Sequence, residues 1–109
     1  MSSDRLKQLL NFYEESPDDS FIRFAIAKEY EKLQDDEQAL AFYLRILDQD
    51  PAYVGNYYHL AKLYERTDDL AKALETYAAG MRVARQQGDQ HAFSELSGAK
   101  VNLELEMDD

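Results

Sequence analysis

Apolar residues recur every three to four positions through most of the chain, which is the spacing of helices with one buried face. In residues 20–33 the apolar positions include Phe21, Phe24, Ala25, Ile26, Ala27 and Tyr30, and a polar break, QDDE, follows at 34–37. The same spacing then resumes with Ala39, Leu40, Tyr43, Leu44 and Leu47. The pattern predicts a helix, a tight turn and a second helix, without the alternation of a strand.

This helical pattern repeats after 34 residues, as the pair Pro17 and Pro51 first shows. The same shift superposes Ala27 on Ala61, Lys28 on Lys62, Tyr30 on Tyr64, Glu31 on Glu65, Asp35 on Asp69, Ala39 on Ala73, Leu40 on Leu74 and Tyr43 on Tyr77. A fixed period of this length is typical of stacked repeats, in which each unit covers the apolar face of its neighbour.

Together the periodicity and the breaks predict six helices, near 4–15, 19–33, 36–48, 52–66, 70–87 and 90–105. Asp35, Asp69 and Asp89 stand where they can cap the helices that follow, and Gln38 is the capping-box partner of Asp35. The first helix should pack against the helix that begins near Ser20. The last helix places Phe93, Leu96, Lys100 and Leu103 along one stripe.

Residues 20–87 resemble the tetratricopeptide repeat family. Its pattern falls on Arg23, Ile26, Ala27, Tyr30, Ala39, Tyr43, Ile46 and Pro51, and then on Tyr57, Leu60, Ala61, Tyr64, Ala73, Tyr77 and Gly80. Four positions depart from it: Arg23 replaces an aromatic residue, Gln34 and Asp68 replace a turn glycine, and Ile46 replaces a small residue. The resemblance implies an all-α fold of antiparallel helix pairs, stacked as a right-handed α-solenoid.

We expect one domain over residues 1–109. Its predicted parts are an N-terminal cap helix at 4–17, a first repeat at 20–53, a second repeat at 54–87, and a C-terminal capping helix with an acidic tail at 88–109.

The charge and composition narrow the classes of function. The chain has 12 Lys and Arg residues and 22 Asp and Glu residues, which gives a net charge of -10. This charge disfavours nucleic acid and anionic membrane surfaces as partners. The chain has no cysteine, which fits a reducing compartment. Neither a signal-peptide core nor an apolar run of about 20 residues is present, so we expect a soluble, cytoplasmic protein.

The sequence offers little for catalysis. His59 and His91 lack a second ligand at metal-binding spacing on their own helix faces, and the acidic clusters fall at helix starts, where carboxylates act as caps. No glycine-rich loop or nucleophile motif is present. We therefore expect no enzyme, no metal and no cofactor.

Charge is segregated in a way that suggests recognition. Residues 20–33 and 54–67 carry five cations and three carboxylates, a net +2, so the remaining residues carry -12. In tetratricopeptide proteins the first helix of each repeat lines a peptide-binding groove. The resemblance places groove positions on Phe21, Phe24, Lys28, Glu31 and Lys32, and on Gly55, Tyr58, Lys62, Glu65 and Arg66.

This set of groove residues suits an acidic or carboxylate-ended peptide with an apolar anchor. A second interpretation stays open, in which the rings pack against the cap helices and the lysines balance Glu31 and Glu65. A clamp for a terminal carboxylate is disfavoured, because Lys28 and Lys62 stand where family members of that kind have Asn.

Three functions follow in order of preference. The first is a non-catalytic adaptor or scaffold that binds a protein or peptide in the groove. The second is a self-associating structural module that forms a homodimer through its cap helices, where Val101 and Leu105 supply apolar area. The third is an anionic-ligand binder or a regulatory subunit of an enzyme complex.

Overall fold

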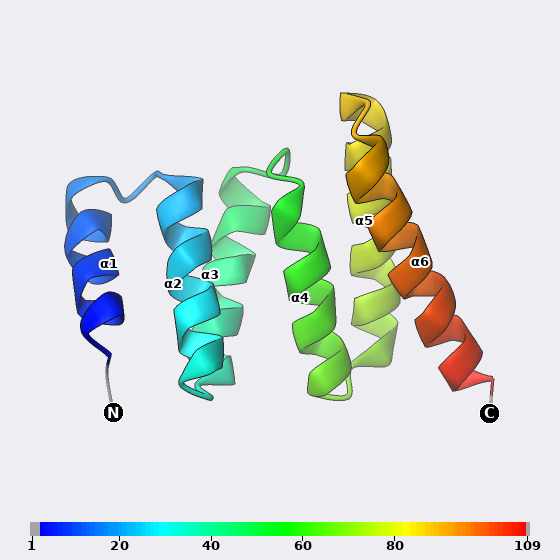
Figure 1. The fold of residues 1–109 in the computed structure, drawn as a ribbon, viewed down its shortest axis with the longest axis horizontal. Helices are drawn as coiled ribbons and strands as arrows, with labels where there is room; N and C mark the ends of the chain where they lie inside the picture. Colours follow the sequence, from blue (N-terminus) through cyan, green and yellow to red (C-terminus); the bar gives the residue numbers. More distant parts are fainter. Residues whose placement is uncertain (1–2, 109) are drawn as a thin grey trace. The chain divides into compact units, whose positions relative to one another are not determined.

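A computed structural model describes residues 3–108, and in this range the chain forms six helices and no strand. They are α1 (Asp4–Glu15), α2 (Ser20–Lys32), α3 (Asp36–Gln49), α4 (Gly55–Arg66), α5 (Leu70–Gln87) and α6 (Gln90–Met107) (Figure 1). The prediction of an all-α fold is confirmed. The chain divides into two compact units, Met1–Tyr53 and Val54–Asp109.

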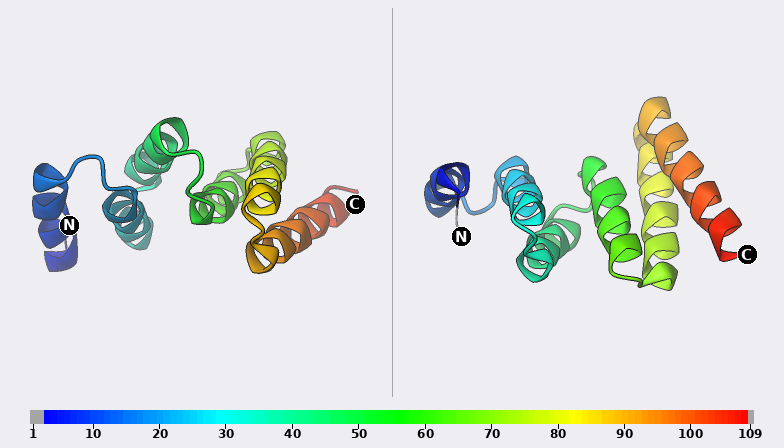
Figure 2. Two further views of the ribbon diagram at one scale, coloured as in Figure 1. Left: turned by 90° about the horizontal axis from the view of Figure 1, so that it is seen from above. Right: turned by 60° about the horizontal axis from the view of Figure 1, so that its bottom comes forward.

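The first unit consists of α1, α2 and α3. Helices α2 and α3 run antiparallel as a hairpin, and α1 packs against α2 as predicted (Figures 1 and 2). The ring of Phe42 on α3 lies 5.4 Å from that of Tyr13 on α1 and 6.0 Å from that of Tyr30 on α2. The buried apolar residues of the first unit are Leu6, Ile26, Ala27, Ala39, Phe42, Tyr43 and Ile46.

The second unit consists of α4, α5 and α6, with α5 packed against both of the others. Its buried apolar residues are Tyr57, Leu60, Ala61, Leu63, Ala73, Tyr77, Ala84, Leu96, Ala99 and Leu103. The predicted stripe of α6 is right for Leu96 and Leu103. Phe93 and Lys100 are only half-buried, and Ala99 completes the buried face instead.

Carboxylates cap the helix starts, as predicted at Asp35, Asp69 and Asp89. Each accepts a hydrogen bond from the backbone N–H three residues on, at 3.2, 3.4 and 3.0 Å. The Gln38 half of the predicted capping box is wrong. A capping box would require the N–H of Asp35 to donate to the Gln38 side chain. This N–H instead donates to the carbonyl of Tyr30 at 2.9 Å, in the turn that ends α2.

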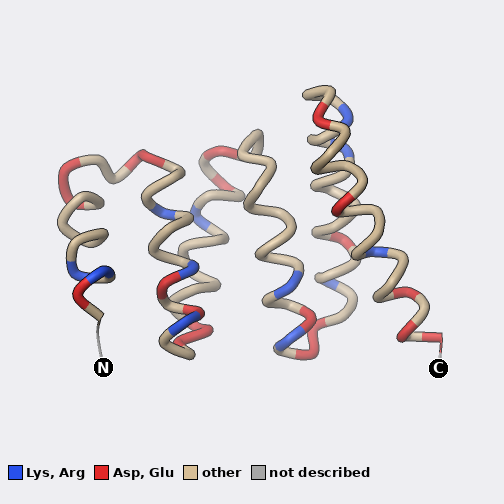
Figure 3. Tube along the Cα trace, viewed as in Figure 1, with Lys and Arg blue, Asp and Glu red and all other residues tan. Residues whose placement is uncertain are grey.

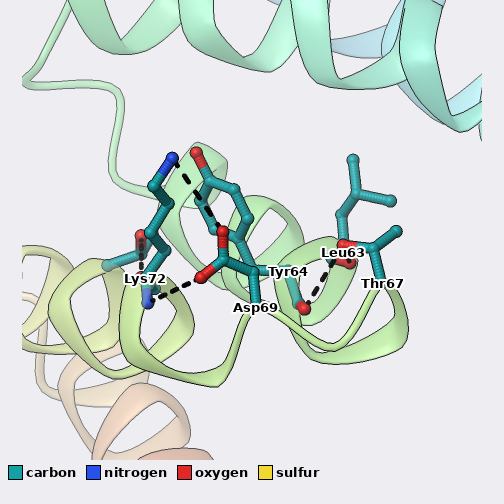
Figure 4. A network of polar contacts seen from close by, with 6 residues as sticks. Leu63, Tyr64, Thr67, Asp69 and Lys72 are labelled. Atoms are coloured by element: carbon teal, nitrogen blue, oxygen red, sulfur yellow. Dashed lines mark hydrogen bonds and ion pairs between the residues drawn. The ribbon is translucent and has the colours of Figure 1, made fainter.

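The turns after α2, α4 and α5 share one geometry. Gln34, Asp68 and Gly88 have φ of 62°, 66° and 70°, the left-handed conformation that ends many helices. The turn geometry is therefore kept where glycine is absent. In the turn after α4, the hydroxyl of Thr67 donates to the carbonyl of Leu63 at 3.0 Å, beside the Asp69 cap (Figure 4).

Helix α4 begins three residues later than expected. Pro51 opens a turn in which the N–H of Tyr53 donates to the carbonyl of Asp50 at 3.0 Å. Val54 then precedes the helix without a side-chain cap. At the other end, α6 continues to Met107, two residues beyond the expectation.

Candidate functional site

The groove residues predicted in the first unit all lie on α2, where they differ in exposure. Phe21 exposes 68% of its surface, and Lys28 and Lys32 are also exposed. Phe24 and Glu31 are half-buried. Helix α2 therefore exposes two lysines and the ring of Phe21 to solvent, whereas the ring of Phe24 and the carboxylate of Glu31 are partly covered.

Phe24 belongs to an aromatic cluster. Its ring lies 6.1 Å from that of Tyr43 on α3 and 5.5 Å from that of Tyr53, which follows α3. The ammonium nitrogen of Lys28, one helical turn on, lies 5.7 Å from the centre of the Phe24 ring. The ring of Phe24 thus contacts two tyrosine rings and lies within cation–π distance of a lysine.

The two carboxylates of α2 bind neighbouring groups. Glu31 accepts a hydrogen bond from the hydroxyl of Tyr43. Glu29 is buried, accepts from the Ser3 hydroxyl at 3.1 Å and lies 3.7 Å from the ammonium of Lys32. Arg5 of α1 approaches the same carboxylate at 3.6 Å. Lys32 therefore pairs with Glu29. The second interpretation of the sequence placed lysines against Glu31 and Glu65, and Lys62 does pair with Glu65 in the second unit.

The predicted residues of the second unit lie on α4 and repeat this arrangement. The ring of Tyr58 lies 6.4 Å from that of Tyr77 on α5 and 5.5 Å from that of His59. The ammonium of Lys62 lies 5.6 Å from the centre of the Tyr58 ring and 3.7 Å from the carboxylate of Glu65.

Glu65 also accepts the hydroxyl hydrogen bond of Tyr77, just as Glu31 accepts that of Tyr43. Gly55 and Arg66 are exposed at the two ends of α4. The cation-covered ring and the tyrosine–carboxylate bond thus occur once in each unit, at positions 34 residues apart.

These environments raise the pKa of two tyrosines. Burial raises the pKa of Tyr77 above its usual 10.0, and the hydrogen bond to Glu65 together with the negative charge of that carboxylate raises it further. Burial also raises the pKa of Tyr53, and the carboxylates of Asp19 and Asp50 add to the effect. Both hydroxyls therefore stay protonated at neutral pH.

Cations and carboxylates interleave along α2 and α4 (Figure 3). Among residues 3–108, no group of three or more His, Asp or Glu side chains is placed to hold a metal ion. His59 is half-buried beside Tyr58, and His91 is exposed. In the same range, no helix combines the length and apolar character that crossing a bilayer requires.

Sequence reasoning overlooked three features. It missed the buried cluster around Glu29 and the tyrosine–carboxylate bonds, although Glu31 and Tyr43 both recur in the second repeat. It also missed a cavity between α5 and α6 whose lining includes Phe93 and Lys100. The repetition of Glu31 and Tyr43 was a usable signal, because paired positions that recur together often touch.

Comparison with known proteins assigns the chain to a family. The family model described as tetratricopeptide repeat matches residues 22–53 and 54–87. A TPR repeat-containing protein of Pseudomonas aeruginosa is 31% identical over 80 residues, which cover 73% of this chain and 76% of the relative.

Solved structures agree with this match. The crystal structure of a tetratricopeptide repeat domain protein from Salinibacter ruber is 48% identical, covers 79% of this chain and 96% of its own, and superposes with a TM-score of 0.75. The solution structure of a protein from Bordetella parapertussis is 26% identical, covers 97% and 91%, and gives a TM-score of 0.81. The chain described here belongs to the tetratricopeptide repeat family.

Proposed function

We propose that this chain is a non-catalytic adaptor that binds protein segments on the exposed face of α2 in the first unit and on that of α4 in the second unit. The observation that carries the proposal is the recurrence, once in each unit, of an aromatic ring with a lysine above it: Phe24 with Lys28, and Tyr58 with Lys62. Tetratricopeptide repeats generally serve as protein-interaction modules, which sets the class of function.

The chemistry of these two faces favours an acidic segment with an apolar side chain. The ammonium groups of Lys28 and Lys62 are exposed and can pair with carboxylates of a ligand, while the rings beneath them offer apolar contact. Phe21 adds exposed apolar area on α2, and Arg66 adds a further cation on α4. Glu31 and Glu65 hold Tyr43 and Tyr77, so we assign them a supporting part in these faces.

The proposed site of action is the cytoplasm, which suits a sequence without cysteine.

Affinity capture with a charge-reversed variant tests the proposal. The native chain and the Lys28→Glu, Lys62→Glu variant are used to recover proteins from the source cell, and each recovered protein is then titrated by calorimetry. We expect a partner whose dissociation constant rises at least tenfold with the variant.

A matched control is the variant Arg45→Glu, Lys72→Glu. It also reverses one cation above an aromatic ring in each unit, since Arg45 lies 4.6 Å from the Phe42 ring and Lys72 lies 5.8 Å from the Tyr64 ring. Neither residue lies on α2 or α4. Equal weakening by the two variants would refute binding at the proposed faces.

Self-association is a second candidate, favoured by exposed apolar side chains on α6. Val101, Leu105 and Met107 expose 48%, 61% and 47% of their surfaces. Sedimentation velocity from micromolar to millimolar concentration tests it, with Leu105→Glu as the disrupting variant. A native chain that stays monomeric throughout this range would exclude it.

A further inference from the structure

The second unit contains a cavity of about 260 Å³ between α5 and α6, and its lining is cationic although the chain as a whole carries -10. The lining residues are Ala78, Met81, Arg82, Arg85, Phe93 and Lys100. Three of them are cations and none is acidic. Figure 3 shows blue, cationic positions on both helices.

The three cations differ in how far they are already engaged. Lys100 forms an ion pair with Glu104 at 3.1 Å. The guanidinium of Arg85 lies 4.9 Å from the centre of the Phe93 ring, which holds it at the cavity but leaves its charge unneutralised. Arg82 is exposed and makes no hydrogen bond or ion pair with any residue in the described range. Two of the three positive charges therefore lack a carboxylate partner in this part of the chain.

The cavity also has an apolar wall. Ala78, Met81 and Phe93 are half-buried, so each offers part of its surface to an occupant while remaining anchored in the unit. Pockets that enclose a whole drug-sized ligand usually measure about 300–1,000 Å³. A volume of about 260 Å³ is below that range and matches a single large apolar side chain better than an entire small molecule.

A smaller hollow of about 120 Å³ lies beside it at the turn between the helices and shares Arg85 and Phe93. It differs in charge because Asp89 contributes to its lining. That carboxylate accepts the N–H of Ala92 as the cap of α6. The excess of positive charge is therefore confined to the larger cavity.

We propose that the cavity between α5 and α6 binds an acidic protein segment, with one large apolar side chain against Met81 and Phe93 and flanking carboxylates on Arg82 and Arg85. Guanidinium groups bind carboxylates in a planar, bidentate manner, and an apolar anchor in a pocket supplies most of the energy of such contacts. The cavity lies on α5 and α6, so the proposal does not depend on the faces of α2 and α4.

Other occupants fit the observations less well. A nucleic acid would meet the same cations, but the net charge of -10 repels a long polyanion. A second copy of the chain could offer the exposed Leu105 between Glu104 and Glu106. The experiment below distinguishes a second copy of the chain from a segment of another protein.

A displayed library of random peptides, selected against the full chain, tests the proposal. We expect enrichment of sequences in which Asp or Glu flank an aromatic or large aliphatic residue. Synthetic versions of the enriched peptides should bind the Arg82→Glu, Arg85→Glu variant at least tenfold more weakly. The single variant Arg82→Glu, which removes no hydrogen bond or ion pair within the described range, should weaken binding as well and guards against a folding defect in the double variant.

The variant Lys28→Glu, Lys62→Glu is the matched control, because it changes the net charge by the same amount. Peptides that bind the cavity should bind this control variant as tightly as they bind the native chain. Their binding should shift the amide resonances of α5 and α6 in ¹⁵N spectra. A selection that enriches no such peptides, or peptides that are insensitive to Arg82→Glu, would overturn the proposal. Loss of binding in the Lys28 and Lys62 variant alone would assign the peptides to α2 and α4 instead.

Two further experiments test the alternative occupants of the cavity, a second copy of the chain and a nucleic acid. Concentration-dependent dimerisation that Arg82→Glu abolishes would overturn the proposal in favour of a second copy. A short single-stranded RNA that binds more tightly than the acidic peptides and is lost with the same variant would overturn it in favour of nucleic acid.

Discussion

The hydroxyl of Tyr77 on α5 donates a hydrogen bond to the carboxylate of Glu65 on α4. Tyr43 makes the same bond to Glu31 in the other unit. In each pair a buried ring directs its polar end towards a half-buried carboxylate, so the hydroxyl has a hydrogen-bond partner inside the fold. The bond joins the two helices of each hairpin, which gives Glu31 and Glu65 a structural task.

Replacing Tyr77 by Phe should lower the free energy of unfolding by about 1.5–3 kcal/mol, the usual range for a hydrogen bond to a charged group. Urea denaturation followed by circular dichroism measures the change. Tyr64→Phe is the control, because the hydroxyl of Tyr64 has no hydrogen-bond partner among residues 3–108. If both variants lost the same amount, the effect could not be attributed to the bond with Glu65.

Alkaline pH should destabilise the second unit through the same tyrosine. The pKa of Tyr77 is raised in the fold above the ordinary 10.0, so above pH 10 the unfolded chain loses this proton while the folded chain keeps it. Its stabilising contribution is complete below pH 10 and declines as the pH rises, by up to about 1.4 kcal/mol per pH unit. Urea titrations between pH 9 and about 11 should therefore show a shallower decline for Tyr77→Phe than for the native chain; parallel declines would contradict the shift.

The 34-residue repeat made most of the fold predictable. Helical periodicity located all six helices of the described residues, because each has an apolar face and a capping side chain or a turn at its start. The beginning of α4 was misplaced because Pro51 can open either a helix or a turn; here it opens a turn, and the ring of Tyr53 in that turn lies 5.5 Å from the ring of Phe24. That contact joins residues far apart in the sequence, which periodicity does not record.

Only the part of the candidate site that recurs with the 34-residue repeat was predictable from the sequence. The lysines above Phe24 and Tyr58 lie one helical turn from the rings and recur with them, so local spacing was enough. The cavity between α5 and α6 is completed by α6, which lies outside the repeated pattern. It depends on how α6 rotates about its own axis, and that rotation buries Ala99 and turns Phe93 and Lys100 towards α5.

Two glycines should respond in opposite directions to alanine. A Cβ added at Gly80 would lie 2.6 Å from the Cβ of Tyr57 and 3.0 Å from Leu96, so α4 and α5 would have to separate. We expect Gly80→Ala to cost about 1–3 kcal/mol, despite the better helix propensity of alanine. At Gly98 the added Cβ meets open space, so Gly98→Ala should stabilise by about 0.5–1 kcal/mol. Thermal unfolding of both variants measures these changes, and a destabilised Gly98→Ala would contradict the propensity argument.

Substitutions at the three left-handed turn residues should also have opposite effects. Gln34 and Asp68 have positive φ, which costs a residue with a Cβ about 1–2 kcal/mol relative to glycine. Gln34→Gly and Asp68→Gly should therefore each stabilise the chain by about 0.5–1 kcal/mol, after the greater flexibility of glycine in the unfolded state is deducted. Gly88→Ala should lower stability by about 1 kcal/mol for the same reason. Urea denaturation checks all three, and a loss of stability in both glycine variants would show that their side chains contribute more than their backbone strain costs.

Arg23 occupies the buried position where the family usually has an aromatic residue. Only 3% of its surface is exposed, and its guanidinium lies 3.5 Å from the carboxylate of Asp18, which faces solvent. Its Nε makes no hydrogen bond to any described residue. Burying a charge with one distant partner costs more than the ion pair returns, and exchange of buried ion pairs for apolar residues often stabilises by about 1–4 kcal/mol.

Arg23→Met, which keeps the length of the apolar stem, should therefore leave the free energy of unfolding unchanged or raise it by about 1 kcal/mol. Asp18→Ala is the informative counterpart, because it removes the only ion-pair partner that the described residues offer Arg23 and should lower stability more than Arg23→Met does. Urea denaturation of both variants decides the matter. A large loss in Arg23→Met alone would mean that the guanidinium itself, and not the apolar stem, secures the packing of α2.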